Sequence, residues 1–587
     1  MIGSDKVIIG NCSGFFGDRL SAAKEMVQGG PIDFLTGDYL AELTMAILFR
    51  LRMKDPSGGY VPTFLKQMEG VMGECLDRGI RVVANAGGLN PRGLASGLAR
   101  IAETLGLKPR IACIEGDDLM PRLADLQASG EEFTHLDKGV PLSASQGMTI
   151  TANAYLGCWG IVKALEEGAD IVVGGRIADA SLVVGPAAWK FGWKRDDWDR
   201  LAGASVAGHI IECGAQASGG NYSFIDEVPS FRKVGFPIAE VRPDGSFTIT
   251  KHPGTGGLVS VDTVKAQLLY EISDPRYLTP DVIARFDTIG ISQEAPDRVL
   301  VRGVRGEPPT GLAKVCINTL QGYRNSMTVI LTGLDIGKKA RIVEEALFDA
   351  VGGREQFRSC VVQLIRSDKE DPATNEEAFA YLRITAMDPD RKKVDRLSSK
   401  VVELALASIP GFAGTAPPGK GTPAIVYWPA LVPGNLVSQK VVIEGKEYAV
   451  ENLPPAVEGV AVETLPPALP PAPSGPTVRV PFGRLFATRS GDKGGNANLG
   501  VWAKTPEAYA FLREFLTTER LLDLLRDVRG CPVERWELPN LLALNFFIRG
   551  ILGEGAAASV KLDAQAKTLG EYLRAKLVDV PASLAPS

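Results

Sequence analysis

The chain has 587 residues, of which 45% are hydrophobic and 23% charged, and its formal net charge is −5 at pH 7. This length exceeds the roughly 250–300 residues at which a single hydrophobic core stops growing, so about two to four domains are expected. The composition excludes a disordered protein, and the scattered Lys and Arg residues form no basic stripe of the kind that binds nucleic acid.

A membrane protein is not expected either. No run approaches the roughly 18 apolar residues of a transmembrane helix, and the opening stretch MIGSDKVIIGNCSG lacks the parts of a signal peptide. The 8 cysteines occur singly, without a CxxC pair, as is usual for reduced thiols in a cytoplasm. We therefore expect a cytoplasmic homo-oligomer whose partner is a small molecule rather than a membrane.

Residues 1–290 predict an α/β core that holds the active cleft. Up to about residue 180, short β-rich runs alternate with longer helical patterns, which is typical of βαβ units around a largely parallel, Rossmann-like layered sheet. The predicted strands are Lys6–Ile9, Phe34–Leu35, Arg81–Ala84, Arg110–Ile114 and Asp170–Val173. An open, doubly wound sheet is the first expectation and a barrel the second.

Polar or glycine-rich turns follow these strands. In α/β folds the ligand binds outside the carboxyl ends of the parallel strands, so the turns should converge on one cleft. The candidate substrate-binding residues in these turns are Asn11, Ser13, Gly14, Asn85, Gly87, Gly88, Asp117, Asp118 and Arg176.

Two of the turns have a further property, since Gly10–Gly17 and Asn85–Gly88 each join a strand to a helix. Backbone amides at such a position are suited to bind an anion at the helix amino terminus. The first loop does not have the GxGxxG spacing of a dinucleotide site, so NAD is not predicted as a cofactor.

Four carboxylates also follow the strands, namely Asp38, Asp117, Asp118 and Asp179. Neighbouring carboxylates can divide acid and base work, or bind a divalent cation through oxygen ligands. Helix capping is the simpler explanation for Asp38, Asp118 and Asp179 taken singly. Because all four would meet at one edge of the sheet, we expect at least one catalytic carboxylate, with Asp38 and Asp179 as the candidates.

The segment GHIIECGAQASGGNY contains His209, one of only 3 histidines. A helix here puts His209, Glu212 and Cys213 on one face through their i, i+3 and i+4 spacing. Such a face can hold an acid/base pair, a thiol nucleophile or part of a metal site, although a histidine and a glutamate near a helix end can also simply satisfy each other. The following glycines and Asn221 would let a ligand approach the backbone closely. His209 and Glu212 are therefore predicted to be catalytic, and Cys213 is a further candidate for which ordinary burial is the alternative.

The rest of the chain predicts three parts. Residues 291–451 combine β-rich stretches with helices near Gly337–Val351 and Arg391–Ala407, which is typical of an α+β subdomain. The β-rich stretches are Arg298–Arg302, Lys314–Leu320, Ser326–Leu331, Val361–Ile365 and Ala378–Ala386. Residues 452–477 are rich in proline and predict an extended linker. Residues 478–587 are long enough to fold as a separate small α+β module.

A polar loop in this last module, Arg489–Asn498, combines two cations with three glycines and amide side chains. Such a loop is suited to capture phosphate or a CoA pyrophosphate, with Lys493 and Asn496 as the binding residues. A polar hairpin without a ligand is the alternative.

Ordered motifs cover nearly the whole chain. The first region contains VIIGNCSGFFGDRLSA, FLTGDYLAELTMAIL, VVANAGGLNP and KHPGTGGLVSVDTVKAQLLYEISDPRYLTPDV, and the last region contains LFATRSGDKGGNANLGVWA. These segments resemble the motifs of the acyclic terpene utilisation (AtuA-like) family. The resemblance implies a ferredoxin-like fold for the last hundred residues or so. It also implies a role in the breakdown of acyclic terpenes such as citronellol and geraniol through acyl-CoA intermediates.

The motifs and the resemblance together predict an enzyme of small-molecule catabolism. Its substrate would be a branched acyl-CoA or carboxylic acid, and its reaction a lyase or hydratase-type acid/base step. Coenzyme A would enter as part of the substrate, and a divalent cation is a further candidate cofactor. The alternative is a non-catalytic acyl-CoA-binding or assembly subunit whose terminal module recruits partner enzymes.

Overall fold

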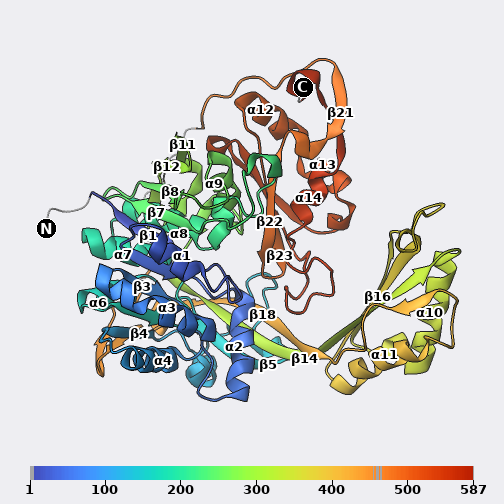
Figure 1. Cartoon of the computed structure of the whole chain (residues 1–587), viewed down its shortest axis with the longest axis horizontal. Helices are drawn as coiled ribbons and strands as arrows, with labels where there is room; N and C mark the ends of the chain where they lie inside the picture. Colours follow the sequence, from blue (N-terminus) through green and yellow to red (C-terminus); the bar gives the residue numbers. More distant parts are fainter. Residues whose placement is uncertain (1–4, 454, 458–461, 463, 465, 586–587) are drawn as a thin grey trace.

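A large sheet forms the centre of the main body of the molecule (Figure 1). The computed structural model describes residues 5–453, 455–457, 462, 464 and 466–585, and five parallel strands form the middle of this sheet. In spatial order they are β1 (Val7–Asn11), β2 (Phe34–Gly37), β3 (Arg81–Ala84), β6 (Ile171–Gly174) and β4 (Ile111–Glu115). All five predicted strands are present and pair in parallel, which confirms the α/β sheet, and the complete sheet is mixed.

Antiparallel strands extend this sheet on both sides. Beside β1 lie β7 (Pro237–Val241), β8 (Phe247–Lys251), β12 (Arg298–Arg302) and β11 (Gly290–Ala295), and beside β4 lie β19 (Lys440–Ile443) and β20 (Lys446–Ala449). The stretch Arg298–Arg302, which the sequence analysis grouped with the α+β subdomain, therefore belongs to the main sheet.

Helices cover both faces of the parallel strands. One face carries α1 (Ala22–Gly29), α3 (Pro62–Arg78) and α4 (Pro91–Thr104), and the other carries α6 (Trp159–Glu166), α7 (Ser181–Phe191) and α8 (Trp198–Ile211). Val82 and Val83 on β3 point into these two different cores, as the period of two in a strand requires. None of the helices in the described part of the chain has the length and apolar character that a membrane crossing requires.

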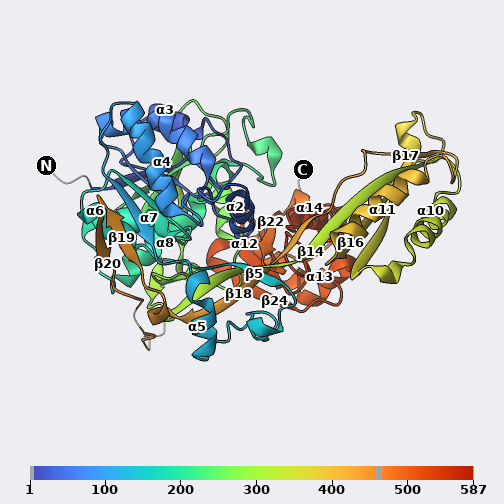
Figure 2. The ribbon, with the colours of Figure 1, turned by 90° about the horizontal axis from the view of Figure 1, so that it is seen from below.

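A separate arm projects from the main body in both overall views (Figures 1 and 2). It is built on β14 (Leu312–Thr332), whose first half pairs with β5 (Met148–Ala154) and β18 (Thr422–Pro433) in the main body. Its second half pairs with β16 (Phe379–Asp388) in the arm, where β15 (Ser359–Arg366), β17 (Phe412–Gly414), α10 (Ile336–Val351) and α11 (Arg391–Glu403) complete the unit. The two strands expected within Lys314–Leu331 are thus one long strand. The register of its pairing with β18 shifts between Leu320 and Gly322, so the chain passes this point without turning back.

The C-terminal module is a four-stranded antiparallel sheet covered by helices. The strand order is β22 (Ala487–Lys493), β23 (Asn496–Trp502), β25 (Ala543–Ile548) and β24 (Val533–Leu538), and the helices are α12 (Pro506–Phe515), α13 (Thr518–Leu524) and α14 (Leu569–Arg574). Of the proline-rich stretch 452–477 that precedes it, residues 454, 458–461, 463 and 465 lie outside the described residues.

The second face of this module sheet packs on the main body. Trp502 and Ala543 belong to the same apolar core as α8, and Trp502 Nε1 donates a hydrogen bond to Asp262 at 3.1 Å. The module therefore has its own core on one side and contributes to the main core on the other.

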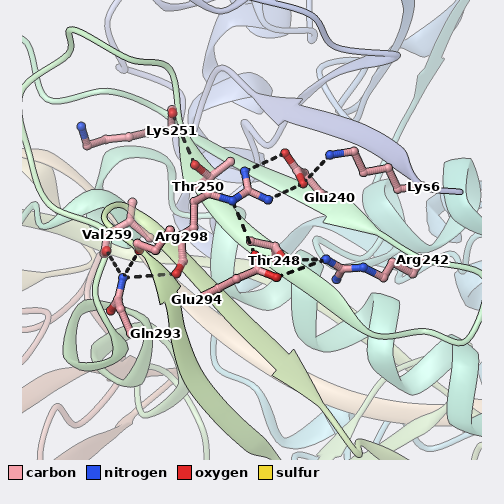
Figure 3. A network of polar contacts seen from close by, with 11 residues as sticks. Lys6, Glu240, Arg242, Thr248, Thr250, Lys251, Val259, Gln293, Glu294 and Arg298 are labelled. Atoms are coloured by element: carbon pink, nitrogen blue, oxygen red, sulfur yellow. Dashed lines mark hydrogen bonds and ion pairs between the residues drawn. The ribbon is translucent and has the colours of Figure 1, made fainter. Parts of the chain in front are cut away.

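Ion pairs hold the antiparallel extension of the main sheet together (Figure 3). Arg298 donates two hydrogen bonds to Glu240, at 3.1 and 2.8 Å, and Lys6 donates a third at 2.7 Å. Arg298 also lies 3.5 Å from Glu294, which faces Arg242 at 3.8 Å. We refer to these five side chains as the ion-pair network.

Candidate functional site

Buried polar side chains gather at the carboxyl ends of β2, β3 and β6, where the ligand edge of the sheet was expected. Arg176, which follows β6, is only 1% exposed. Its Nη2 donates to Asp179 Oδ1 at 2.7 Å, and its guanidinium lies 4.2 Å from the centre of the Tyr155 ring. Asp38, which follows β2, accepts a hydrogen bond of 2.6 Å from Asn85, which follows β3. The turns after three strands therefore supply one buried set of charges.

The end of α8 approaches this edge because Asn11 holds it there. Asn11, the last residue of β1, donates from Nδ2 to the carbonyl oxygens of Ile211 at 2.5 Å and Glu212 at 3.1 Å. A Cβ on Gly14 would overlap the backbone of Cys213, so only glycine allows this close contact. The opening loop thus positions the carboxyl terminus of α8.

His209 and Glu212 lie side by side in this part of the structure. His209 Nδ1 is 3.6 Å from Glu212 Oε1, and the two side chains are 1% and 7% exposed. Glu212 Oε2 and both ring nitrogens of His209 are buried and have no hydrogen bond of good geometry among the described residues, and the backbone of Gln267 and Leu268 is the polar group nearest in effect to the ring. The His209 ring packs against Tyr277 and Phe286, with ring centres 4.7 and 5.5 Å apart. A buried polar atom without a partner calls for an explanation, and a bound ligand or water is one.

The C-terminal module contributes further polar residues next to His209 and Glu212. Asn498, on β23, accepts a hydrogen bond from the backbone N–H of Glu271 at 2.8 Å and donates to the carbonyl of Leu269 at 2.6 Å. Glu271 has a left-handed backbone (φ 57°), which is uncommon outside glycine and concentrates at functional sites. Lys493 lies at the end of β22, and its positive charge lowers the pKa values of both His209 and Glu212. We call Asp38, Arg176, Asp179, His209, Glu212, Glu271 and Lys493 the polar centre.

Burial and charge separate the proton affinities of these groups. Burial, with the charge of Asp179, raises the pKa values of Asp38 and Glu212 well above their ordinary range. Burial, with the charge of Lys493, lowers the pKa of His209 to about 4. At neutral pH the imidazole is therefore uncharged and the Glu212 carboxyl is biased toward its protonated form.

Asp492, next to Lys493, is a further carboxyl with a shifted pKa. Burial, together with the charges of Glu271 and Glu42, raises its pKa to about 7. Glu42 begins α2 (Glu42–Lys54) and lies 3.4 Å from Lys314 on β14. Carboxyls from three distant parts of the chain therefore influence one another where the module meets the main body.

The other two strand-end carboxylates have different surroundings. Asp117 accepts hydrogen bonds from the backbone N–H of Arg176 at 2.9 Å and from Asn153 at 2.8 Å, and burial raises its pKa to about 6. It thereby orients the turn that carries Arg176. Asp118 is exposed and accepts a hydrogen bond from the Met120 amide at 3.0 Å, two residues on, which is a local turn interaction. Asp38 and Asp179 are thus the two strand-end carboxylates that belong to the polar centre.

Three glycine amides of the two expected anion loops are bonded within the protein. The Gly14 amide donates to Asp18, the Gly87 amide to the Gly174 carbonyl and the Gly88 amide to the Asn85 carbonyl. The side chain of Ser13 donates to the carbonyl of Phe15. These turns shape the edge of the sheet through their own hydrogen bonds.

The remaining candidates are Cys213, Asn221 and Asn496. Burial and the charges of Glu212 and Glu271 raise the pKa of the Cys213 thiol well above its usual value, which disfavours the nucleophilic thiolate. Asn221 is exposed and donates to Gln216 at 3.0 Å. Asn496 donates to Asp137 at 2.8 Å and accepts from the Gly550 amide. Across the residues that the structure describes, no three or more His, Cys, Asp or Glu side chains are placed to hold a metal ion together.

Two parts of the chain match the models of known protein families. Residues 7–443 match the model of the acyclic terpene utilisation family protein AtuA. The chain belongs to this family. Residues 480–579 match the AtuA ferredoxin-like domain, which corresponds to the C-terminal module. A search of curated proteins found no match.

Membership of the AtuA family indicates a role in acyclic terpene utilisation. The polar centre draws on both matched regions, since Asp38, Arg176, Asp179, His209 and Glu212 lie in the first and Lys493 in the second. Glu271 is the member of the polar centre that the sequence analysis did not name as a candidate. Only the packing of the module on the main body brings it together with Asn498.

Proposed function

We propose that this AtuA-family chain is an enzyme that transfers protons on a branched carboxylic acid or its CoA ester, in a lyase or hydratase-type reaction. The observation that carries the proposal is the pair Glu212 and His209. Both are buried, both have unbonded polar atoms, and their environments move their pKa values in opposite directions. Titratable neighbours whose pKa values are pushed apart are characteristic of acid/base sites.

Each partner then has a role that follows from its proton state. The protonated Glu212 carboxyl acts as the general acid, and the uncharged His209 imidazole acts as the general base. Removal of a proton next to a carboxyl or thioester places negative charge on its carbonyl oxygen. Lys493 makes no ion pair with a described residue and acts on both groups, so its ammonium is suited to stabilise that charge.

Asp38, Asp179 and Arg176 support this chemistry from the sheet edge. Asp179 engages Arg176 directly, and its charge raises the pKa of both Asp38 and Glu212. Arg176 is buried and Asp179 is 28% exposed, and this ion pair fixes the charges beside Glu212. Asp38 and Asp179 therefore tune and position Glu212, whereas Glu212 and His209 are the groups that contact the substrate.

Exchange of substrate protons with deuterated water tests the proposal with the full-length protein. The parent is incubated with a panel of branched acids and their CoA esters, and isotope uptake is read by mass spectrometry. We expect uptake with at least one panel member and its loss in Glu212→Gln. Glu240→Gln, which changes a buried carboxyl of the ion-pair network, is the matched control and should exchange like the parent. If the parent binds panel members but exchanges none of them, the chain is a binding or assembly subunit instead.

A further inference from the structure

Arg489 is a buried cation without an anionic partner. It lies on β22 of the C-terminal module and is 6% exposed. Its guanidinium makes no hydrogen bond or ion pair with any residue that the structure describes, and its Nη2 atom is buried and unbonded. The guanidinium carbon lies 4.3 Å from the centre of the Tyr270 ring.

Other arginines of this chain show what a paired guanidinium looks like. Arg176 is 1% exposed and donates a hydrogen bond to Asp179, and Arg298 donates two hydrogen bonds to Glu240. Taking a charge out of water without a partner is unfavourable, so a fold seldom keeps such a group unless a ligand supplies the counter-charge. The planar guanidinium fork matches the oxygens of a carboxylate or phosphate.

The surroundings of Arg489 are built to hold it toward the main body. Alternate residues of a strand share a face, so Arg489, Gly491 and Lys493 all lie on the side of β22 that faces residues 269–271. A Cβ at Gly491 would overlap the Tyr270 ring, so the missing side chain makes room for that ring. Lys567 bonds the Tyr270 hydroxyl, and its ammonium lies 4.6 Å from the centre of the same ring.

Two carboxyls lie near these cations, and neither pairs with Arg489. The charge of Glu271 raises the pKa values of Tyr270, Glu212 and Asp492, and the charge of Lys567 lowers the pKa of Asp492. Tyr270 connects these cations and carboxyls to the polar centre, because Cys213, the neighbour of Glu212, also contributes to the raised pKa of Tyr270. The unpaired guanidinium is therefore adjacent to the polar centre and separate from its acid/base pair.

We propose that Arg489, assisted by Lys567, binds an anionic oxygen group of the substrate, so that the module anchors the ligand while the main body transfers the proton. This inference rests on the proposed function, since it assigns the anchor for the same substrate. Arg489 and Lys493 are four residues apart, which is about 13 Å along a strand. The Tyr270 ring packs on Gly491 between them, so the anchoring cation and Lys493 lie on either side of that ring.

Calorimetric titration of the full-length protein tests the anchor without requiring turnover. The probes are inorganic phosphate, coenzyme A and 3-methylbutanoate, with the neutral 3-methylbutanamide as a control. We expect at least one anionic probe to bind the parent, and Arg489→Met to weaken it by about tenfold or more, as loss of a charge-assisted pair predicts. Binding of phosphate and coenzyme A would identify a CoA phosphate as the anchored group, and binding of 3-methylbutanoate alone would identify a carboxylate.

Three further measurements keep the result unambiguous. Arg479→Met, at an exposed arginine on β21 (Thr477–Pro481), should bind like the parent. Arg489→Met should melt at the same temperature as the ligand-free parent or higher, because an unpaired buried charge is removed. Glu212→Gln should keep the affinity and lose only proton exchange, so the anchor and the acid/base proposal fail separately. Equal affinity in Arg489→Met and the parent, no binding of any anionic probe, or a lower melting temperature with unchanged affinity would each overturn the proposal.

Discussion

The ion-pair network and the polar centre both place several charges in a small volume, but they treat those charges differently. In the network, Glu240 is bonded by Arg298 and Lys6, whose own side chains are about one-third exposed. In the polar centre, Glu212 and His209 are nearly inaccessible and keep unbonded atoms. Arg489, next to the centre, has no hydrogen-bond or ion-pair partner among the described residues.

The pKa values follow this difference. Although burial alone would raise it, the bonds from Arg298 and Lys6 bring the pKa of Glu240 below its ordinary value. The pKa of Glu212 is raised, because burial and neighbouring carboxylates outweigh Lys493 and Arg176. Paired charges stabilise a fold modestly, whereas unpaired buried charges are kept at a cost in stability and point to function. The charges of the ion-pair network therefore serve the fold, whereas those of the polar centre point to function.

The largest expected effect is on activity. His209→Ala should lower proton exchange by about 10²–10⁴-fold if the imidazole performs general base work, while the fold survives. Exchange rates with the most active panel member, together with circular dichroism, check this. Near-normal exchange in a correctly folded variant would remove His209 from the mechanism.

Stability should respond in opposite directions in the two regions. Glu240→Gln removes a charge from three hydrogen bonds, so we expect a loss of about 1–3 kcal/mol in the free energy of unfolding. Glu212→Gln replaces a carboxyl that is costly to ionise by a neutral isostere and should leave stability unchanged or higher. Urea unfolding at neutral pH measures both variants. A large loss in Glu212→Gln would make that residue a structural charge like Glu240.

The pH dependence of these two effects should also differ in sign. Because the pKa of Glu240 is lowered on folding, its stabilisation is complete above the ordinary value of 4.5 and is lost as the pH falls through the lower folded pKa. Because the pKa of Glu212 is raised, the parent should lose stability relative to Glu212→Gln as the pH rises from 4.5 toward the folded pKa. Unfolding curves of both variants over this range provide the test, and parallel curves would contradict it.

Salt should produce the smallest effect. The cations of the network are partly exposed, so raising the ionic strength should reduce the stability difference between the parent and Glu240→Gln by a few tenths of a kcal/mol. The difference for Glu212→Gln should not change, because buried charges are poorly screened. Urea titrations at low and high salt measure both differences, and equal salt sensitivity would contradict the assignment.

The strands of the parallel sheet could be predicted from the sequence because each is a short apolar run that ends in a polar or glycine-rich turn. The same logic brought out Asp38, Asp179, His209 and Glu212, since chemical type and spacing are local properties. Glu271 could not be found in this way. It meets Asn498 across 227 positions of the chain, and that contact exists only because the module packs on the main body.

Two features of the structure have local causes that the sequence does not display. The stretch around Gly322 was expected to separate two strands, but a shift in register lets β14 continue through it. The glycine turns were expected to offer free amides. Asp18, four residues beyond Gly14, takes up one of them, and carbonyl groups of the same sheet edge take up two others.

In the proposed mechanism Glu212 is the proton donor of the polar centre, and its raised pKa favours the acid form that this role requires. Infrared difference spectroscopy measures this directly, because a protonated carboxyl absorbs separately from a carboxylate. The account predicts that the parent shows a protonated-carboxyl band at neutral pH and that Glu212→Gln loses part of it, whereas Glu240→Gln leaves it unchanged. A spectrum in which Glu212→Gln removes only carboxylate absorption would contradict the account.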